Sequence, residues 1–221
     1  MTMKVDVFSF NTRGLNDDKK RRSVFKWLKS LYKGIILLQE THSTRIDERK
    51  WLNEWGGEII FSHGTNRSKG VAVLFPKLLD FQINENKIDK EGRFIVLDID
   101  VDNTNLILCN LYAPTKDKLQ DQIKFLSEIQ KLIESYQEKN IILAGDFNTY
   151  LDPKLDKQGG IEASMSKYGL QLKALIEEFN LIDAWRVLNP NNRRFTWRNH
   201  TKRWFCPIPY RLLFYLNPYA L

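Results

Sequence analysis

Residues 139–152 read KNIILAGDFNTYLD, in which the apolar run IILA is followed by Gly145 and then by polar residues. A short apolar run of this kind predicts a β-strand covered on both faces, and the glycine allows a sharp turn after it. Asp146 and Asn148 then stand at the carboxyl end of the strand. In layered α/β proteins, loops of neighbouring strands converge at this end, so ligand sites collect there. The plainer interpretation is ordinary turn chemistry, in which Asp and Asn side chains bond nearby backbone amides.

The rest of the chain mixes strand-like and helical patterns. Strands are predicted at residues 5–10, 34–38, 58–62, 70–75, 93–101, 105–111 and 140–144. Those between residues 58 and 111 follow one another without a helix, which is typical of antiparallel hairpins, and Asp102-Asn103-Thr104 is a predicted hairpin turn.

Apolar residues recur at helical spacing in three stretches, and we expect each stripe to face the core. The stripes are Val24, Trp27, Leu28 and Leu31; Leu126, Ile129, Ile133 and Tyr136; and Leu172, Leu175, Ile176 and Phe179. Asp17 or Asp18 is suited to start the first helix. Helices on either side of a run of strands favour one α/β (α+β) domain, a sandwich of two packed sheets covered outside by helices.

Three more predicted strands end on polar residues that apolar packing does not demand, namely Asn11, Glu40 and Tyr112. Glu40 and Asp146 offer the hard oxygen ligands that Mg²⁺ prefers. Asn11 and Asn148 can orient ligands without adding negative charge, and Tyr112 can donate a hydrogen bond to a phosphate oxygen. If these strand ends share one rim, the set suits metal-assisted attack of water on a phosphodiester.

Composition indicates the kind of partner and the cellular location to expect. The 221 residues carry a net charge of +7, with basic clusters at 19–22, 193–194 and 202–203, so a polyanionic partner is plausible. Cys109 lies in an apolar run, and two cysteines imply no disulfide framework. We find no signal-peptide pattern and no apolar run long enough for a bilayer, so we expect an intracellular protein of the cytoplasm or nucleus, without membrane association. The histidines at 42, 63 and 200 lack metal-ligand spacing.

The motifs SFNTRGLN, LLQETH, LCNLYAPT and ILAGDFNT, in this order and separation, resemble the endonuclease/exonuclease/phosphatase superfamily. The likeness is greatest to the apurinic-type endonuclease domain of non-LTR (LINE-type) retrotransposons, which KIDKEGRFIVLDI and NLIDAWRVLNPNNRRFTWRN also resemble. The resemblance extends from Lys4 to about Asn199. It implies a four-layer α/β sandwich, a site at one edge, and Mg²⁺-dependent cleavage of double-stranded DNA, with Mn²⁺ as a possible substitute.

The resemblance also assigns roles to residues of this chain. It implies that Asn11 and Glu40 stand on the metal side, that Tyr112 contacts the phosphate, and that Asp146 and Asn148 lie at the scissile phosphate. The implied metal ligands are Glu40, Asn11 and Asp146. Thr196 and Trp197 match a stretch on the DNA-facing rim of the family and are the implied substrate-binding pair.

The end of the sequence departs from the family, whose members finish with a Ser-Arg-x-Asp stretch, a strand, and a terminal Ser-Asp-His. These motifs do not occur here, and residues 204–221 read WFCPIPYRLLFYLNPYAL. Codons can be chosen for this segment that, read one base later, give GFVQSRIDYFFI, which restores Ser-Arg-x-Asp. We therefore expect a family domain at 1–203 with missing or altered C-terminal strands, and an aberrant, out-of-frame tail at 204–221. Sequencing the coding DNA around Arg203 tests this hypothesis.

Because the Asp-His pair is the expected water-activating or phosphate-stabilising apparatus, the resemblance predicts an endonuclease that is inactive or weakly active as written. One alternative is a non-catalytic DNA-binding remnant that keeps the charge and the rim. Another is a superfamily phosphatase or phosphodiesterase acting on lipids, inositol phosphates or RNA tails, against which DKEGRF and FTWRN count.

Overall fold

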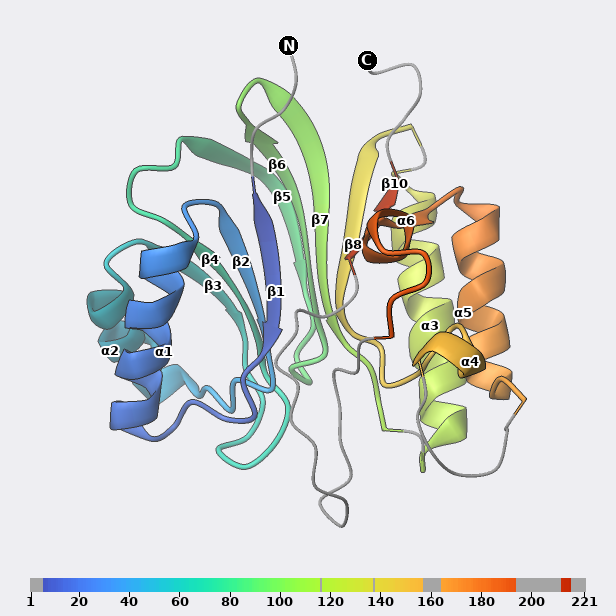
Figure 1. Cartoon of the computed structure of the whole chain (residues 1–221). Helices are drawn as coiled ribbons and strands as arrows, with labels where there is room; N and C mark the ends of the chain where they lie inside the picture. The colour runs from blue at the N-terminus through green and yellow to red at the C-terminus, as the bar shows by residue number, and fades with distance from the viewer. Residues whose placement is uncertain (1–5, 116, 137, 157–163, 194–211, 216–221) are drawn as a thin grey trace.

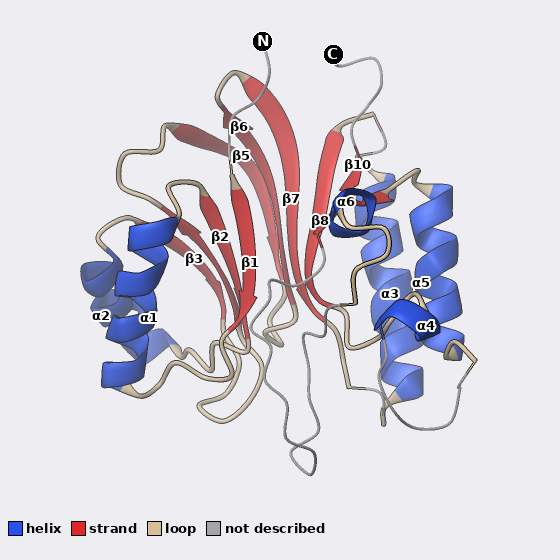
Figure 2. Cartoon of the chain, in the orientation of Figure 1, coloured by secondary structure: helices blue, strands red, loops and turns tan. Residues whose placement is uncertain are grey.

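Two β-sheets pack face to face and helices cover both outer faces in a computed structural model of the chain (Figures 1 and 2). The structure describes residues 6–115, 117–136, 138–156, 164–193 and 212–215. The order of layers is helix, sheet, sheet, helix, so the predicted four-layer sandwich is confirmed.

The first sheet holds four strands in the order β1-β2-β4-β3. They are β1 (Val7–Asn11), β2 (Ile35–Gln39), β3 (Glu58–Ser62) and β4 (Val71–Phe75). β1 and β2 pair in parallel and the other pairs are antiparallel. The helices on this side are α1 (Asp18–Leu31), which connects β1 to β2, and α2 (Glu48–Trp55), preceded by the short 3₁₀ helix η1 (Arg45–Asp47).

The second sheet has the strand order β5-β6-β7-β8-β10-β9. Its strands are β5 (Phe81–Ile88), β6 (Phe94–Val101), β7 (Thr104–Tyr112), β8 (Asn140–Asp146), β9 (Ile182–Asp183) and β10 (Leu212–Tyr215). β7 and β8 pair in parallel, and α3 (Leu119–Glu134) connects them. The other helices on this side are α4 (Pro153–Asp156), α5 (Lys167–Glu178) and α6 (Ala184–Leu188).

The stretch IILA of β8 shows why the central strands are apolar on both faces. Ile142 and Ala144 belong to the core between the two sheets, whereas Ile141 and Leu143 face the core under α3 and α5. β2 alternates in the same way between the middle core and the core under α1 and α2. Each fully buried Ile or Leu stabilises the fold by about 1.5–3 kcal/mol, so both faces hold the strand in place.

Several sequence expectations are confirmed. Asp17 is the N-cap of α1, where its side chain accepts a hydrogen bond from Lys20 N at 2.7 Å. Asp102 and Asn103 both adopt positive φ, 50° and 57°, as a two-residue hairpin turn requires. Cys109 is buried, and burial raises the pKa of its thiol to about 12. The stripes predicted on α3 and α5 face the core.

The stripe predicted on α1 is confirmed only in part, because Leu28 is buried and Val24 packs against the core. Trp27 and Leu31 are 40% and 56% exposed, and the buried face is formed by Arg21, Phe25 and Leu28. Because Arg21 is charged, the apolar pattern of the sequence does not show that this residue belongs to the buried face. Arg21 can be buried because its guanidinium pairs with Asp18 at 2.8 Å and with Glu54 at 2.7 Å.

Two of the longer elements were not predicted, and neither were the short elements η1, α4, α6, β9 and β10. α2 is eight residues long and buries only two tryptophans, too few for a clear helical period. β5 lies at the edge of its sheet and is mostly exposed, so its sequence FQINENKI has little apolar pattern.

Part of the tail predicted as aberrant belongs to the second sheet. β10 pairs antiparallel with β8, from Leu212 opposite Ala144 to Tyr215 opposite Ile141. Beyond β8 the described part of this sheet holds the short strands β10 and β9.

Candidate active site at the strand ends

The predicted site residues come from four strand ends at one edge of the sandwich. Asn11 is the last residue of β1 and Glu40 follows β2, while Tyr112 and Asp146 are the last residues of β7 and β8. β1 and β8, in different sheets, both end toward the lower edge in Figure 1. β1 pairs in parallel with β2, with Asn11 opposite Gln39, and β7 pairs in parallel with β8, with Tyr112 opposite Asp146. The carboxyl ends of these four strands therefore lie at the same edge of the sandwich.

Asn11 joins the two carboxylates of the site. Its side-chain Nδ2 donates to Glu40 Oε1 at 2.7 Å and to Asp146 Oδ2 at 2.9 Å. Its Oδ1 accepts a hydrogen bond from the backbone N of Arg13 at 3.0 Å, which fixes the orientation of the amide. One carboxamide therefore ties a residue of the first sheet to a residue of the second.

Asn148 supports the same cluster from the loop after β8. Its backbone N donates to Asp146 Oδ1 at 3.0 Å, and its Nδ2 donates to Ala113 O at 2.7 Å. The turn needs Gly145, which has a φ of 136°, and a Cβ there would lie 2.0 Å from Leu111 O. Turn chemistry and site assembly are thus both present, and the two interpretations of this stretch do not exclude each other.

The pKa of the Asp146 carboxyl depends on its burial and on its neighbours. Burial raises the pKa of its carboxyl above the ordinary value, and the negative charge of Glu40 raises it further. The Asn148 N–H, the Asn11 amide and the positive charge of Arg13 oppose this shift because they stabilise the ionised form. Two adjacent carboxylates with few counter-charges favour a bound cation.

Tyr112 is 9% exposed and lies beside the carboxylates. Burial, the charge of Glu40 and a hydrogen bond with Glu40 all raise the pKa of its phenol, so Tyr112 is neutral and can donate a proton in a hydrogen bond at neutral pH. All five strand-end residues predicted from the sequence therefore lie in one neighbourhood.

The loops around the site are held in unusual backbone conformations. Arg13, Glu40, His42 and Asn148 have φ values between 50° and 55°. Such left-handed conformations cost free energy for non-glycine residues and tend to cluster at functional sites. Lys20 Nζ stabilises the loop after β1 by donating to Thr12 O at 2.8 Å and Arg13 O at 2.9 Å.

A buried polar pair, missed in the sequence, lies between the sheets just before the site. Gln39 Nε2 donates to Asn110 Oδ1 at 2.7 Å, and Asn110 Nδ2 donates to Leu38 O and Ala72 O at 3.1 and 2.9 Å. Both side chains are fully buried. Because unpaired buried amides cost free energy, these hydrogen bonds favour one alignment of the two sheets, although the Gln39 Oε1 is buried without a hydrogen-bond partner. The available signal was a carboxamide inside each of two apolar strands.

The donor set fits a hard divalent cation. Glu40 and Asp146 supply carboxylate oxygens in one cluster, and Mg²⁺ commonly takes one or two carboxylates together with water and phosphate oxygens. Within the described residues no group of three or more His, Cys, Asp or Glu side chains could hold a metal. Two carboxylates are thus the protein's main charged contribution.

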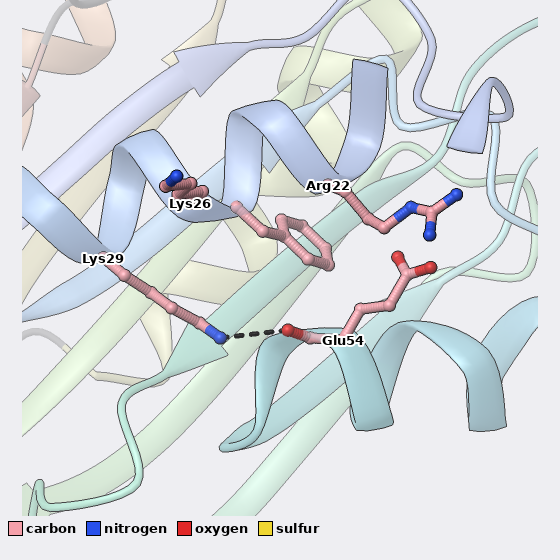
Figure 3. A pocket seen from close by; sticks show the side chains of 5 residues that line it. Arg22, Lys26, Lys29 and Glu54 are labelled. Carbon is pink, nitrogen blue, oxygen red and sulfur yellow. Dashed lines mark hydrogen bonds between the residues drawn. The ribbon is translucent and has the colours of Figure 1, made fainter. Parts of the chain in front are cut away.

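Other features lie away from this cluster or outside the described residues. Thr196 and Trp197, the predicted substrate-binding pair, lie outside the described residues. A pocket between α1 and α2 is lined by Arg22, Phe25, Lys26, Lys29 and Glu54, and it shares no residue with the site (Figure 3). Of the helices in the described part of the chain, none has the length and apolar character for a bilayer crossing.

Fold and site together define a layered α/β protein with a carboxylate cluster at one edge. The chain belongs to the Endonuclease/Exonuclease/phosphatase family, which residues 8–208 match. It is 28% identical over 196 residues to the Transposon TX1 uncharacterized 149 kDa protein of Xenopus laevis. That alignment covers 88% of this chain but 15% of the relative, so the chain spans a small part of the transposon protein.

Solved structures share the fold at low sequence identity. An AP endonuclease from Archaeoglobus fulgidus superposes with a TM-score of 0.70 at 17% identity, covering 96% of this chain and 86% of that one. The AP endonuclease LMAP from Leishmania major gives 0.75 at 14% identity, with coverage of 94% and 78%. The catalytic domain of Xenopus laevis APE2 gives 0.67 at 19% identity, with coverage of 94% and 81%.

Proposed function

We propose that the chain is the endonuclease domain of a LINE-type retrotransposon protein, a Mg²⁺-dependent phosphodiester hydrolase acting on double-stranded DNA. Family membership and the likeness to a transposon protein support this proposal. The observation that carries it is the bridge from Asn11 to both Glu40 and Asp146, which brings two carboxylates of different sheets into one cluster.

The proposed roles follow from the contacts of each residue. Glu40 and Asp146 would hold Mg²⁺, or Mn²⁺ in its place. Asn11 is also proposed as a ligand, but it turns its Nδ2 toward both carboxylates and its Oδ1 toward Arg13 N, so ligation through Oδ1 would require its amide to turn over. The cation would supply charge stabilisation at the phosphate. Asn11 and Asn148 keep the Asp146 carboxylate oriented through the hydrogen bonds described above. Tyr112, neutral and beside Glu40, would donate a hydrogen bond to a phosphate oxygen.

DNA binding is proposed to use backbone charge more than base readout. The chain carries a net charge of +7, so we expect salt-sensitive binding with little sequence preference. Thr196 and Trp197 remain the proposed substrate-binding residues. Target preference would then depend on loop shape and on the deformability of the DNA.

We further propose that these 221 residues cleave DNA weakly or not at all, because they contain no Ser-Asp-His. The proposed division is a family domain at 1–203 and an out-of-frame tail at 204–221. The absence of Ser-Asp-His also favours the second candidate function, a remnant that binds DNA but does not cleave it.

Nicking of supercoiled plasmid in Mg²⁺ tests these proposals. The 221-residue chain would be compared with a frame-restored chain, in which the coding sequence after Arg203 is read one base later. A Glu40→Ala variant of each protein would serve as its control. We expect nicking by the frame-restored chain that disappears in the Glu40 variant. Nicking that survives the substitution or the addition of EDTA would contradict the proposed site, and salt-dependent binding without any nicking would favour the remnant.

A further inference from the structure

Arg93 lies directly before β6 and contacts the end of β7, where Tyr112 is located. Its backbone O accepts a hydrogen bond from Tyr112 N at 2.7 Å. Its side-chain Nη1 donates to Tyr112 O at 3.3 Å and to Ala113 O at 3.4 Å. One arginine thus holds Tyr112 by its backbone on both sides of the residue.

The same guanidinium lies against the Tyr112 ring. Arg93 Cζ is 5.0 Å from the ring centroid, within the range of a cation–π contact. Arg93 is half-buried, so water screens this contact less than at an exposed site. Its own backbone is fixed in turn, because Arg93 N donates to Asp89 Oδ2 at 2.7 Å.

We propose that Arg93 is a positioning residue for Tyr112, holding the phenol ring in the orientation that directs its hydroxyl toward Glu40. Arg93 lies within the stretch KIDKEGRFIVLDI, but the sequence assigned it no role. The positive charge of Arg93 also opposes the rise in the pKa of Tyr112 that burial and Glu40 cause. The inference rests on the proposed function only insofar as Tyr112 acts on a phosphate.

The geometry separates arginine from lysine at this position. A planar guanidinium can stack on a ring while it donates to two carbonyl oxygens, whereas an ammonium on a flexible stem can occupy the ring face without the same fixed donors. We therefore expect Arg93→Lys to restore part of what Arg93→Gln loses. A purely electrostatic contact to DNA would be satisfied by either cation.

The test combines a ring readout with a kinetic one. In the 221-residue chain labelled with ¹³C-tyrosine, the Tyr112 signals are assigned with Tyr112→Phe. We expect Arg93→Gln to shift and broaden these ring signals, Arg93→Lys to reverse part of the change, and the exposed control Arg49→Gln to leave them unchanged. Unchanged Tyr112 signals in Arg93→Gln would overturn the proposal.

In the frame-restored chain, we expect Arg93→Gln to lower the nicking rate by about 10- to 100-fold, as for a misplaced catalytic group, with less than about a twofold change in plasmid affinity. A fall in affinity equal to the fall in rate would overturn the proposal in favour of a phosphate contact. Absence of nicking by the form that keeps Arg93 counts against the proposed function alone, and the ring signals then decide the role of Arg93.

Discussion

Removing the Asn11 side chain should destabilise the protein in a pH-dependent manner. Asn11→Ala deletes two hydrogen bonds, of 2.7 and 2.9 Å, to carboxylate acceptors. A hydrogen bond to a charged group contributes about 1.5–3 kcal/mol. Asn11 is 6% exposed, but Glu40 and Asp146 are partly open to water, which places both bonds at the low end. We expect a loss of about 3 kcal/mol in the free energy of unfolding at pH 7.

The pH dependence follows from the charge on Asp146. The Asn11 amide lowers the pKa of Asp146 by stabilising the ionised form, so the variant should have a higher Asp146 pKa than the parent. Its loss of stability should therefore be smallest in acid, where Asp146 is protonated in both proteins, and should grow as the pH rises.

Urea unfolding at pH 4 and pH 7 measures this difference, with the exposed helical variant Asn53→Ala as a control expected to change stability by less than about 0.5 kcal/mol. An Asn11→Ala protein as stable as its parent at pH 7, or one whose loss is equal at both pH values, would refute the reasoning.

Three further predictions concern single residues. Glu54→Gln should lower the free energy of unfolding by about 3 kcal/mol, because Arg21, 1% exposed, loses a carboxylate that accepts from it at 2.7 and 3.0 Å; a urea midpoint like that of the parent would contradict this. Gly145→Ala should lower the melting temperature far more than Gly56→Ala. A Cβ at Gly145 would meet a backbone oxygen at 2.0 Å, whereas a Cβ at Gly56 would meet only a flexible side-chain end at 4.0 Å. Equal shifts in melting temperature would disprove the steric argument. Mn²⁺ affinity should fall as the pH is lowered from 7 to 5, because the raised pKa of Asp146 lets protons compete with the metal at a higher pH than at an ordinary aspartate. An affinity that does not change over this pH range would count against Asp146 as a ligand.

Much of the fold could be predicted from the sequence, because buried strands and amphipathic helices carry strong periodic signals. The IILA run of β8 and the hairpin turn at Asp102 are examples. Prediction failed where tertiary contacts override the pattern. The buried face of α1 includes Arg21, which pairs with Asp18 in the same helix and with Glu54, 33 positions later in the chain. No local pattern reports the second of these partners.

The residue types of the site could also be predicted, because polar residues at the ends of apolar strands are unexpected there. What could not be predicted is how they connect. The donation from Asn11 to both carboxylates depends on the packing of the two sheets, which the buried pair of Gln39 and Asn110 helps to fix. Arg93 was missed for the same reason, since its contacts with Tyr112 arise from strand pairing.

A titration with Mn²⁺, followed by electron paramagnetic resonance, tests most directly whether the cluster at the strand ends is a cation site. We expect the chain to bind Mn²⁺ and to lose this binding in both Glu40→Gln and Asp146→Asn, while Asp100→Asn, which alters an exposed carboxylate on β6, leaves it unchanged. Equal binding by all four proteins, or no binding by the parent chain, would contradict the account.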